Sequence, residues 1–213
     1  VTKGLTRTMQ PARAWDCLSS SQVPGNDDLN RNDSGDNELW GEMMQLESSD
    51  EEARISLIET ERLGLESTPD TPQLQGLCTI GLRTFKSSAC RISIVGKAHT
   101  WHISQCGTPR VLTQPRNNTV CNHVVTEDSE EVQVFLDIPQ SRTLAGTLAA
   151  ALNTARFWAG APLIFERNGK RLKLGVLVIA DPKPRTSFDE EQKAMLAALA
   201  RAAVRELEAT KAA

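Results

Sequence analysis

Cys121 and His123 are the residues whose types and spacing come nearest to a reactive pair. A cysteine beside a histidine can act as a nucleophile if its pKa is lowered and the imidazole lies within hydrogen-bonding reach. The alternative is a small buried core cysteine and a histidine that bonds to the backbone. We favour the alternative, and the sequence predicts no catalytic residue and no enzyme.

The other cysteines and histidines do not predict a metal site. The five cysteines form no CxxC pair and no metal-ligand spacing, and their odd number argues against a disulfide framework. His99 and His102 flank Trp101 without a carboxylate cluster, so we interpret them as surface or core residues. We therefore expect neither a metal nor a cofactor.

Composition narrows the classes of partner. The formal net charge is −3 and no basic stripe is present, which argues against a nucleic-acid binder. No apolar run approaches the roughly 18 residues of a membrane span, so we expect a soluble, intracellular protein. Residues 1 to 14 contain three basic residues and no acid, as at the end of an organelle transit peptide. A plastid or another organelle is therefore one expected location and the cytoplasm is the other. A domain cut from a longer protein is the alternative origin of the chain.

The first 50 residues are predicted to form a polar, acidic, extended arm, because residues 16 to 53 are rich in Ser, Asn, Asp and Gly. A few large apolar residues interrupt this composition and could anchor the arm on a protein partner or on the chain's own domain. The predicted anchors are Trp15, Leu39, Trp40 and Met43.

Residues 156 to 185 are predicted to be the centre of the fold. Two apolar runs flank Asn168-Gly169, a pair that favours a two-residue hairpin turn because both residues tolerate positive φ. The run 174–179 is nearly continuous in apolar character and predicts a central strand covered on both faces. Gly175 lies where a bulky side chain would strain a strand packed under helices.

Helices are predicted on both sides of this centre. Apolar spacing predicts helices over residues 51–65 and 74–86, and strands over 89–95, 100–104 and 132–137. Ser187 and Glu190 form a capping-box pattern before a final helix over 189–209, which we expect to pack on the sheet beside residues 51–65.

Three of these segments, 157–163, 174–177 and 181–185, resemble the C-terminal half of a GAF domain in order and spacing. The similar branch occurs in bacterial and fungal sensor kinases and cyclases. Thr71-Pro72, Trp101 and the segment 115–125 extend the resemblance over about residues 51–209, leaving 210–213 as a tail.

The resemblance implies an α/β (α+β) domain. Its GAF-like sheet should be mostly antiparallel, with five or six strands and with the N- and C-terminal helices packed on one face. It also implies a ligand pocket between the sheet and its covering segments, although the same positions could be core. From Ile138 onward the covering loop departs from the pattern of the branch. The matching pocket positions are Trp101, Thr119, Cys121, His123, Asp137, Phe157 and Trp158.

Two functions are compatible with this resemblance. The favoured one is an accessory or scaffold subunit of a larger, organellar assembly, attached partly through the arm and without catalysis. The other is a small-molecule-binding sensory domain of a signalling protein, with a homodimer formed through the terminal helices. Some GAF proteins reduce small sulfoxides, but their characteristic paired cysteines are absent here.

Overall fold

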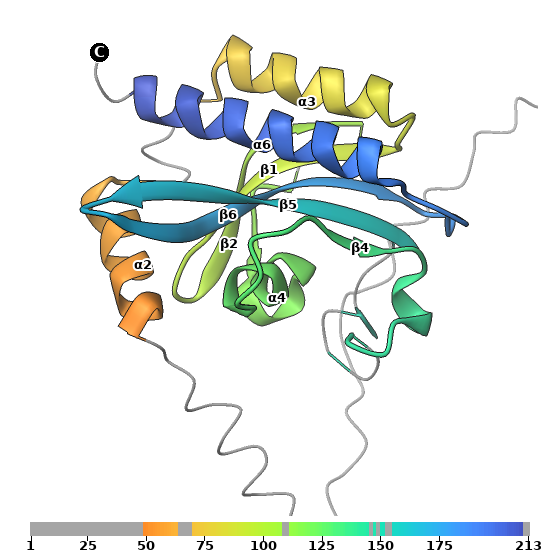
Figure 1. Ribbon diagram of the computed structural model, residues 1–213, viewed down its shortest axis with the longest axis horizontal. Coiled ribbons are helices and arrows are strands. Elements are labelled where there is room, and N and C mark those ends of the chain that lie inside the picture. The colour runs from red at the N-terminus through yellow and green to blue at the C-terminus, as the bar shows by residue number, and fades with distance from the viewer. Residues whose placement is uncertain are drawn as a thin grey trace, which may run out of the picture. The chain divides into compact units, whose positions relative to one another are not determined.

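The computed structural model describes residues 49–63, 70–107, 111–144, 147, 150–151 and 155–210. These residues form an antiparallel sheet with helices on both faces (Figure 1). The helices are α2 (Ser49–Thr60), α3 (Pro72–Thr84), α4 (Val120–Thr126) and α6 (Glu190–Ala209), and the short 3-10 helices are η1 (Arg116–Asn118) and η2 (Ile138–Gln140). The strands are β1 (Ala89–Val95), β2 (His99–Cys106), β3 (Thr113–Pro115), β4 (Gln133–Phe135), β5 (Phe157–Arg167) and β6 (Lys170–Asp181).

The sheet has six strands in the order β3-β2-β1-β6-β5-β4, and every neighbouring pair is antiparallel. The predicted fold class is therefore confirmed. Strand β6 lies between β1 and β5, as its nearly continuous apolar run predicted. The turn between β5 and β6 consists of Asn168 and Gly169, whose φ angles are 54° and 74°, the left-handed values that this hairpin requires.

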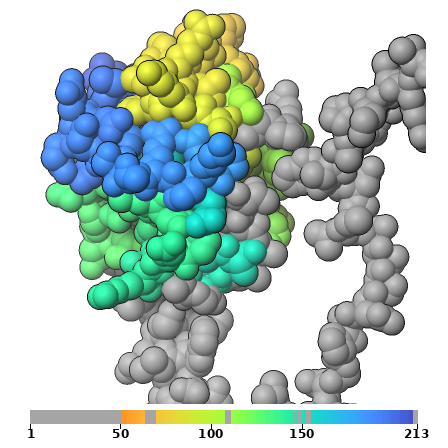
Figure 2. Space-filling model, turned by 90° about the vertical axis from the view of Figure 1, so that its right-hand side faces the viewer, coloured from red at the N-terminus to blue at the C-terminus, as the bar shows by residue number. Residues whose placement is uncertain are grey.

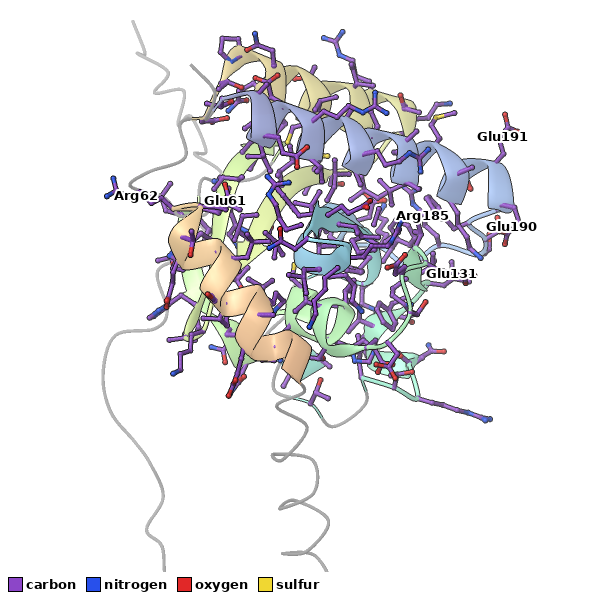
Figure 3. All side chains as sticks on the ribbon, turned by 60° about the vertical axis from the view of Figure 1, so that its left-hand side comes forward. Glu61, Arg62, Glu131, Arg185, Glu190 and Glu191 are labelled. Atoms are coloured by element: carbon purple, nitrogen blue, oxygen red, sulfur yellow. The ribbon has the colours of Figure 1, made fainter. Side chains whose placement is uncertain are left out.

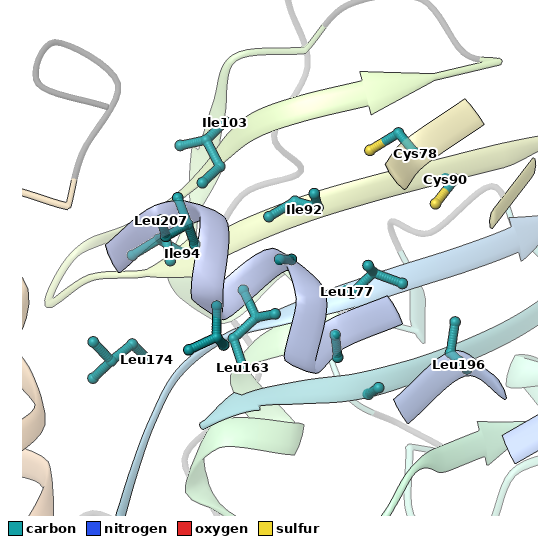
Figure 4. Close-up of a cluster of buried hydrophobic side chains, with 14 of the residues drawn as sticks. Cys78, Cys90, Ile92, Ile94, Ile103, Leu163, Leu174, Leu177, Leu196 and Leu207 are labelled. Carbon is teal, nitrogen blue, oxygen red and sulfur yellow. The ribbon is translucent and has the colours of Figure 1, made fainter. Parts of the chain in front are cut away.

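Alternation along the strands produces two cores. One apolar cluster lies between the sheet and the helices α3 and α6, and it includes Cys90, Ile92 and Ile94 of β1 (Figure 4). The second cluster lies under α4 and includes Val124, Trp158 and Val176. Because successive strand residues point to opposite faces, Arg91 and Ser93 of β1 point toward α4.

Helix α6 packs beside α3, and not beside residues 51–65 as predicted (Figures 1 and 2). Helix α2 lies at one end of the sheet, on the side of α4 (Figure 1). Its side chain Arg54 is only 3% exposed and donates to the carbonyl of Val95 at the end of β1 and to Glu51. A buried guanidinium must be hydrogen-bonded. The carbonyl of Val95 is available at this end of the sheet, and this favours the position of α2 there.

The N-cap of α6 also differs from the prediction. Asp189, two residues after Ser187, caps the helix: its Oδ1 accepts from the Gln192 amide at 2.8 Å, and its own amide donates to Gln192 Oε1 at 2.9 Å. Phe188 is buried against Phe85 and Phe157 and fixes where the chain enters the helix. Glu190 and Glu191 follow at the exposed first turn (Figure 3), where acids suit the helix dipole. Among the described helices, none combines the length and apolar character needed to cross a bilayer.

Candidate functional site

A group of buried and half-buried polar side chains lies between the sheet and α4. We call it the polar cluster; its members come from β1, β2, β3, the residue before α4, and α4 itself. They are Arg91, Ser93, Thr100, His102, Gln114, Thr119 and Cys121. Ser93 and Thr100 are fully buried, and His102 is 3% exposed. Burying this many polar groups costs free energy unless they find partners.

His102 is the centre of a hydrogen-bonded chain. Its Nε2 lies 3.1 Å from Gln114 Oε1, which can only accept, so Nε2 carries the proton. Its Nδ1 lies 2.8 Å from Ser93 Oγ and is left as an acceptor, so the Ser93 hydroxyl donates to it. Burial lowers the pKa of His102 from 6.5 to about 4, Gln114 opposes this, and the nearby charge of Arg91 adds to it. The imidazole is therefore neutral at physiological pH.

Two threonines attach the start of α4 to the sheet. The Thr119 hydroxyl donates to the Arg116 carbonyl at 2.9 Å. Its oxygen therefore accepts from the Thr100 hydroxyl of β2, at 3.1 Å. This places Val120 and Cys121, the first residues of α4, against the sheet, where they are 1% and 5% exposed.

Cys121 is held as a thiol. Burial raises its pKa from 9.0 to about 12, although the Arg91 guanidinium and a hydrogen bond with Ser93 act in the opposite direction. The reactive form of a cysteine is the thiolate, so Cys121 is not an activated nucleophile at neutral pH in this arrangement. It does not form the Cys–His pair that we considered, because helix residues two apart do not face each other. His123 Nδ1 instead lies 3.5 Å from Glu127 Oε1.

The buried imidazole makes the stability of the protein pH-dependent. The pKa of His102 is lower in the folded state than in the unfolded state, so the unfolded chain binds more protons between about pH 6.5 and 4. We expect the unfolding free energy of the wild type to fall by up to about 3 kcal/mol more than that of His102→Gln over this window. Urea unfolding of both proteins at pH 7 and pH 4.5 measures the difference. Equal losses would contradict a neutral, buried His102.

Glu51 of α2 ties this helix to the segment that carries α4. Its carboxylate accepts from Arg54 at 2.8 Å and from Arg116 Nη1 at 2.5 Å. Arg116 also donates through Nε to Asn122 of α4. Burial would raise the pKa of Glu51, but the hydrogen bonds from both arginines outweigh it and lower the pKa from 4.5 to about 2.

The predicted pocket residues divide between the two faces of the sheet. Thr119 and Cys121 belong to the polar cluster. Trp158 lies on the same face against Phe135, with ring centroids 5.7 Å apart, and His123 contacts Phe135 at 5.8 Å. The Asp137 carboxylate, which precedes η2, pairs with Arg156 at 2.5 Å.

Trp101 and Phe157 do not join this group. Both pack with the cluster under α3 and α6, because neighbouring strand residues such as Phe157 and Trp158 must point to opposite faces. Phe157 contacts Phe188 and lies under the Arg185 guanidinium, 4.2 Å from its ring centroid. The predicted partner-binding residues Trp15, Leu39, Trp40 and Met43 lie outside the described residues.

Sequence reasoning missed Arg91, Ser93, His102 and Gln114. The signal was the polar residues that alternate with apolar ones in 89–95, which we interpreted only as a polar strand face. His102 was interpreted as a surface or core residue, because its partners are distant in sequence. Tertiary structure was required to bring Gln114 of β3 and Cys121 of α4 to the same place.

An open depression of about 460 Å³ lies elsewhere, at the junction of α3, β1 and the end of β6. Arg185 of this depression (Figure 3) is engaged by Asp181 at 2.5 Å and by the carbonyl of Phe85 at 2.8 Å. These contacts join the end of β6 to the end of α3. We interpret Arg185 as a residue that stabilises this junction and not as a ligand-binding residue.

No family model and no curated protein matches the chain. Solved structures do. The GAF domain of an Acinetobacter phosphoenolpyruvate-protein phosphotransferase superposes with a TM-score of 0.53 at 13% identity, over 75% of this chain and 96% of that one. A far-red cyanobacteriochrome photoreceptor gives 0.52 at 10% identity, over 82% and 97%. The free methionine-R-sulfoxide reductase of Neisseria meningitidis, solved with its substrate, gives 0.53 at 18% identity, over 73% and 88%.

The last of these comparisons corrects a prediction. We expected the chain not to be an enzyme, and the similarity to free methionine-R-sulfoxide reductases contradicts that expectation, because enzymes share this fold. The absence of the paired cysteines was therefore not sufficient evidence to exclude catalysis. Identities of this size establish the fold alone: the chain has a GAF-like fold.

Proposed function

We propose that this chain is a ligand-binding domain that holds a small, negatively charged polar molecule between the sheet and α4. The observation that supports the proposal is the polar cluster itself. It concentrates hydrogen-bonding groups and one guanidinium on a single face of a sheet whose opposite face is apolar.

The chemistry of the cluster favours an anion. Burial lowers the pKa of Arg91, which means that its positive charge is costly in this place. The carboxylate or phosphate of a ligand would offset that cost, and a guanidinium can bind either one with two parallel hydrogen bonds. The hydroxyls of Ser93, Thr100 and Thr119 donate within the protein, and each could rotate to donate to a ligand by leaving its present acceptor.

The neighbours give independent support for binding in this type of fold. One of them is the GAF domain of a phosphotransferase, and another was solved with its substrate, free methionine-R-sulfoxide being the molecule that its name specifies. The resemblance seen in the sequence also implies a pocket between the sheet and its covering segments. Thr119 and Cys121, two positions of that pocket, belong to the polar cluster.

Binding can be tested with defined anions. We expect at least one of L-methionine-R-sulfoxide, L-methionine, succinate and a cyclic nucleotide to raise the melting temperature of the protein. Arg91→Met should weaken that binding at least tenfold, because the ligand loses a buried charged partner. Arg171→Gln is the control, since it removes an exposed pair with Glu130 at the sheet's far hairpin. If Arg91→Met binds as tightly as the wild type, the ligand does not occupy the polar cluster.

A second candidate function is the reduction of a small sulfoxide at the same site. The observation that favours it is the Cys121 thiol beside Ser93 and Arg91. A Cys121 thiolate would attack the sulfoxide sulfur, the sulfur–oxygen bond would break, the substrate would leave as the sulfide, and Cys121 would keep the oxygen as a sulfenic acid. An added dithiol would reduce the sulfenic acid back to the thiol with release of water and become a disulfide. Cys121 is protonated in the present arrangement, so this reaction requires that Cys121 loses its proton when the substrate binds beside Arg91.

The two candidates are separated by turnover. Dithiothreitol-dependent loss of L-methionine-R-sulfoxide, abolished by Cys121→Ser, would support the reductase. Binding of a ligand that survives Cys121→Ser, without turnover, would support the binding domain alone. Attachment to a larger assembly through residues 1–50 remains a separate proposal, which rests on Trp15, Leu39, Trp40 and Met43 in the sequence.

A further inference from the structure

Three cysteines meet on the face of the sheet opposite the polar cluster. Cys78 belongs to α3, Cys90 to β1 and Cys106 to β2. Cys78 and Cys90 are fully buried, and Cys106 is half-buried. Helix α3 and the hairpin of β1 and β2 follow one another along the chain, so all three cysteines belong to one local unit of the fold.

The side chains of Cys78 and Cys90 lie next to each other, and their interaction shifts the pKa of both thiols in opposite directions. Figure 4 shows the two labelled side chains, one from the helix and one from the strand below it. The Cys90 sulfur packs so closely on α3 that a Cβ added to Gly81 would lie 2.8 Å from it. Glycine at position 81 therefore provides the space in which the sulfur of Cys90 reaches the helix.

Cys106 connects this pair to the surface. It lies directly opposite Cys90 in the antiparallel pairing of β1 and β2, where side chains on one face come within contact distance. Its sulfur lies 3.5 Å from Thr79 Oγ1 and 3.5 Å from Gln75 Oε1, both on α3. The three thiols thus form a path from a half-exposed position to a buried one.

We propose that these cysteines are a site of reversible oxidation by low-molecular-mass disulfides, in which Cys106 reacts first and a Cys78–Cys90 disulfide is the product. Closing that bond would join α3 covalently to β1. The proposal does not depend on the ligand-binding function, because it concerns the opposite face of the sheet.

The exchange balances without further reactants. Cys106 attacks a disulfide RSSR, forms Cys106–S–SR and releases one RSH. Cys90 passes its proton to an ionised Cys78 and attacks the Cys106 sulfur, which breaks the bond to SR, releases the second RSH with that proton and forms Cys90–Cys106. Cys78 then attacks the Cys90 sulfur, and Cys106 leaves and regains a proton. Two protein thiols are oxidised and one RSSR is reduced to two RSH.

The contacts of Cys78 suit it to the last step. The hydrogen bond from Cys90 lowers the pKa of Cys78, burial opposes this, and Ser104 also stabilises the thiolate. The same contact and burial raise the pKa of Cys90. Within the pair, Cys78 is therefore the more acidic thiol and the better attacking group. A core role for three small apolar residues is the alternative, and it predicts no reaction in the folded state.

The experiment uses the full chain with Cys17→Ser, so that the protein contains only the four cysteines that the structure describes. The folded protein is incubated with glutathione disulfide, quenched with an alkylating agent and digested with trypsin. The four cysteines fall in separate peptides, 63–83, 87–91, 98–110 and 117–142. Circular dichroism before the quench confirms that the protein is folded.

We expect glutathione on peptide 98–110 first and then a disulfide between 63–83 and 87–91, while Cys121 in 117–142 remains alkylated. Cys106→Ser should slow the formation of that disulfide at least tenfold, and Cys121→Ser, the matched control, should leave the rate unchanged. Cys78→Ser should stop the exchange at Cys90–Cys106. The proposal is overturned if Cys78 and Cys90 stay reduced in the folded protein, or if Cys106→Ser forms their disulfide at the wild-type rate.

Discussion

Replacing Gly175 by alanine is expected to lower the unfolding free energy by about 2–4 kcal/mol. A Cβ at this position would lie 2.0 Å from the carbonyl oxygen of Ser93 and 3.1 Å from the Cα of Ile94. These are backbone atoms of β1, the strand that pairs with β6, so no side-chain rotation can relieve the contact. The two central strands must separate locally, and the sheet loses pairing where both of its cores meet.

Gly76→Ala is the matched control for this substitution. Gly76 lies within α3, and an added Cβ there meets no atom within 4 Å. Alanine is the better helix former, so we expect this variant to be stabilised by about 0.5–1 kcal/mol. Urea unfolding of both variants measures the contrast. An unchanged stability of Gly175→Ala would show that β1 and β6 are not as close at this position as the structure places them.

Replacing Glu51 by glutamine is expected to lower the unfolding free energy by about 3 kcal/mol at pH 7. The carboxylate is 17% exposed and neutralises Arg54 and Arg116, which are 3% and 14% exposed. Its removal leaves two neighbouring guanidiniums without their shared partner. Because Arg116 also holds Asn122, the variant should loosen α4 over the polar cluster as well.

The loss in Glu51→Gln should depend on pH in a defined direction. The pKa of Glu51 is about 2 in the folded protein and near 4.5 when unfolded, so the carboxylate stabilises the fold fully above pH 4.5. That contribution disappears as the pH falls toward 2, and the difference between wild type and variant should shrink between pH 7 and pH 3.

Glu130→Gln is the control, because it removes a solvent-exposed charge pair. Its partner Arg171 is 55% exposed, and a pair this exposed contributes less than about 1 kcal/mol. If Glu51→Gln costs no more than Glu130→Gln, the two arginines find other acceptors and α2 is not tied to α4 through Glu51.

The direction of the Gly175 effect could be predicted from the sequence, but its cause could not. A glycine in an apolar strand indicates a close approach, and the sequence suggested the covering helices. The structure identifies the backbone of Ser93 instead. Pairing between β6 and β1 joins residues 81 to 91 positions apart in the chain, from Ile94 with Gly175 to Ala89 with Ala180, and a single sequence contains no local signal for such a pair.

Local patterns determined the elements themselves. Asn168-Gly169 specified the hairpin because only a few residues adopt positive φ at low cost, and the apolar run after it specified the central strand. The final helix followed from its apolar spacing. The predicted N-cap was Ser187, but Asp189 caps the helix. Ser187 with Glu190 and Asp189 with Gln192 both fit the capping-box pattern, and the burial of Phe188 selects the second pair.

The site depended on tertiary structure. Strand alternation placed Arg91 and Ser93 on one face, which the sequence can indicate, but the partners His102, Gln114 and Cys121 come from three other elements. The same alternation separated Phe157 from Trp158, which the family resemblance had grouped together. The period of two along a strand is a local property that the sequence determines. Which strand pairs with β1 and which helix covers each face of the sheet depends on burying both apolar faces of the sheet at the same time. That condition is met only in the folded chain.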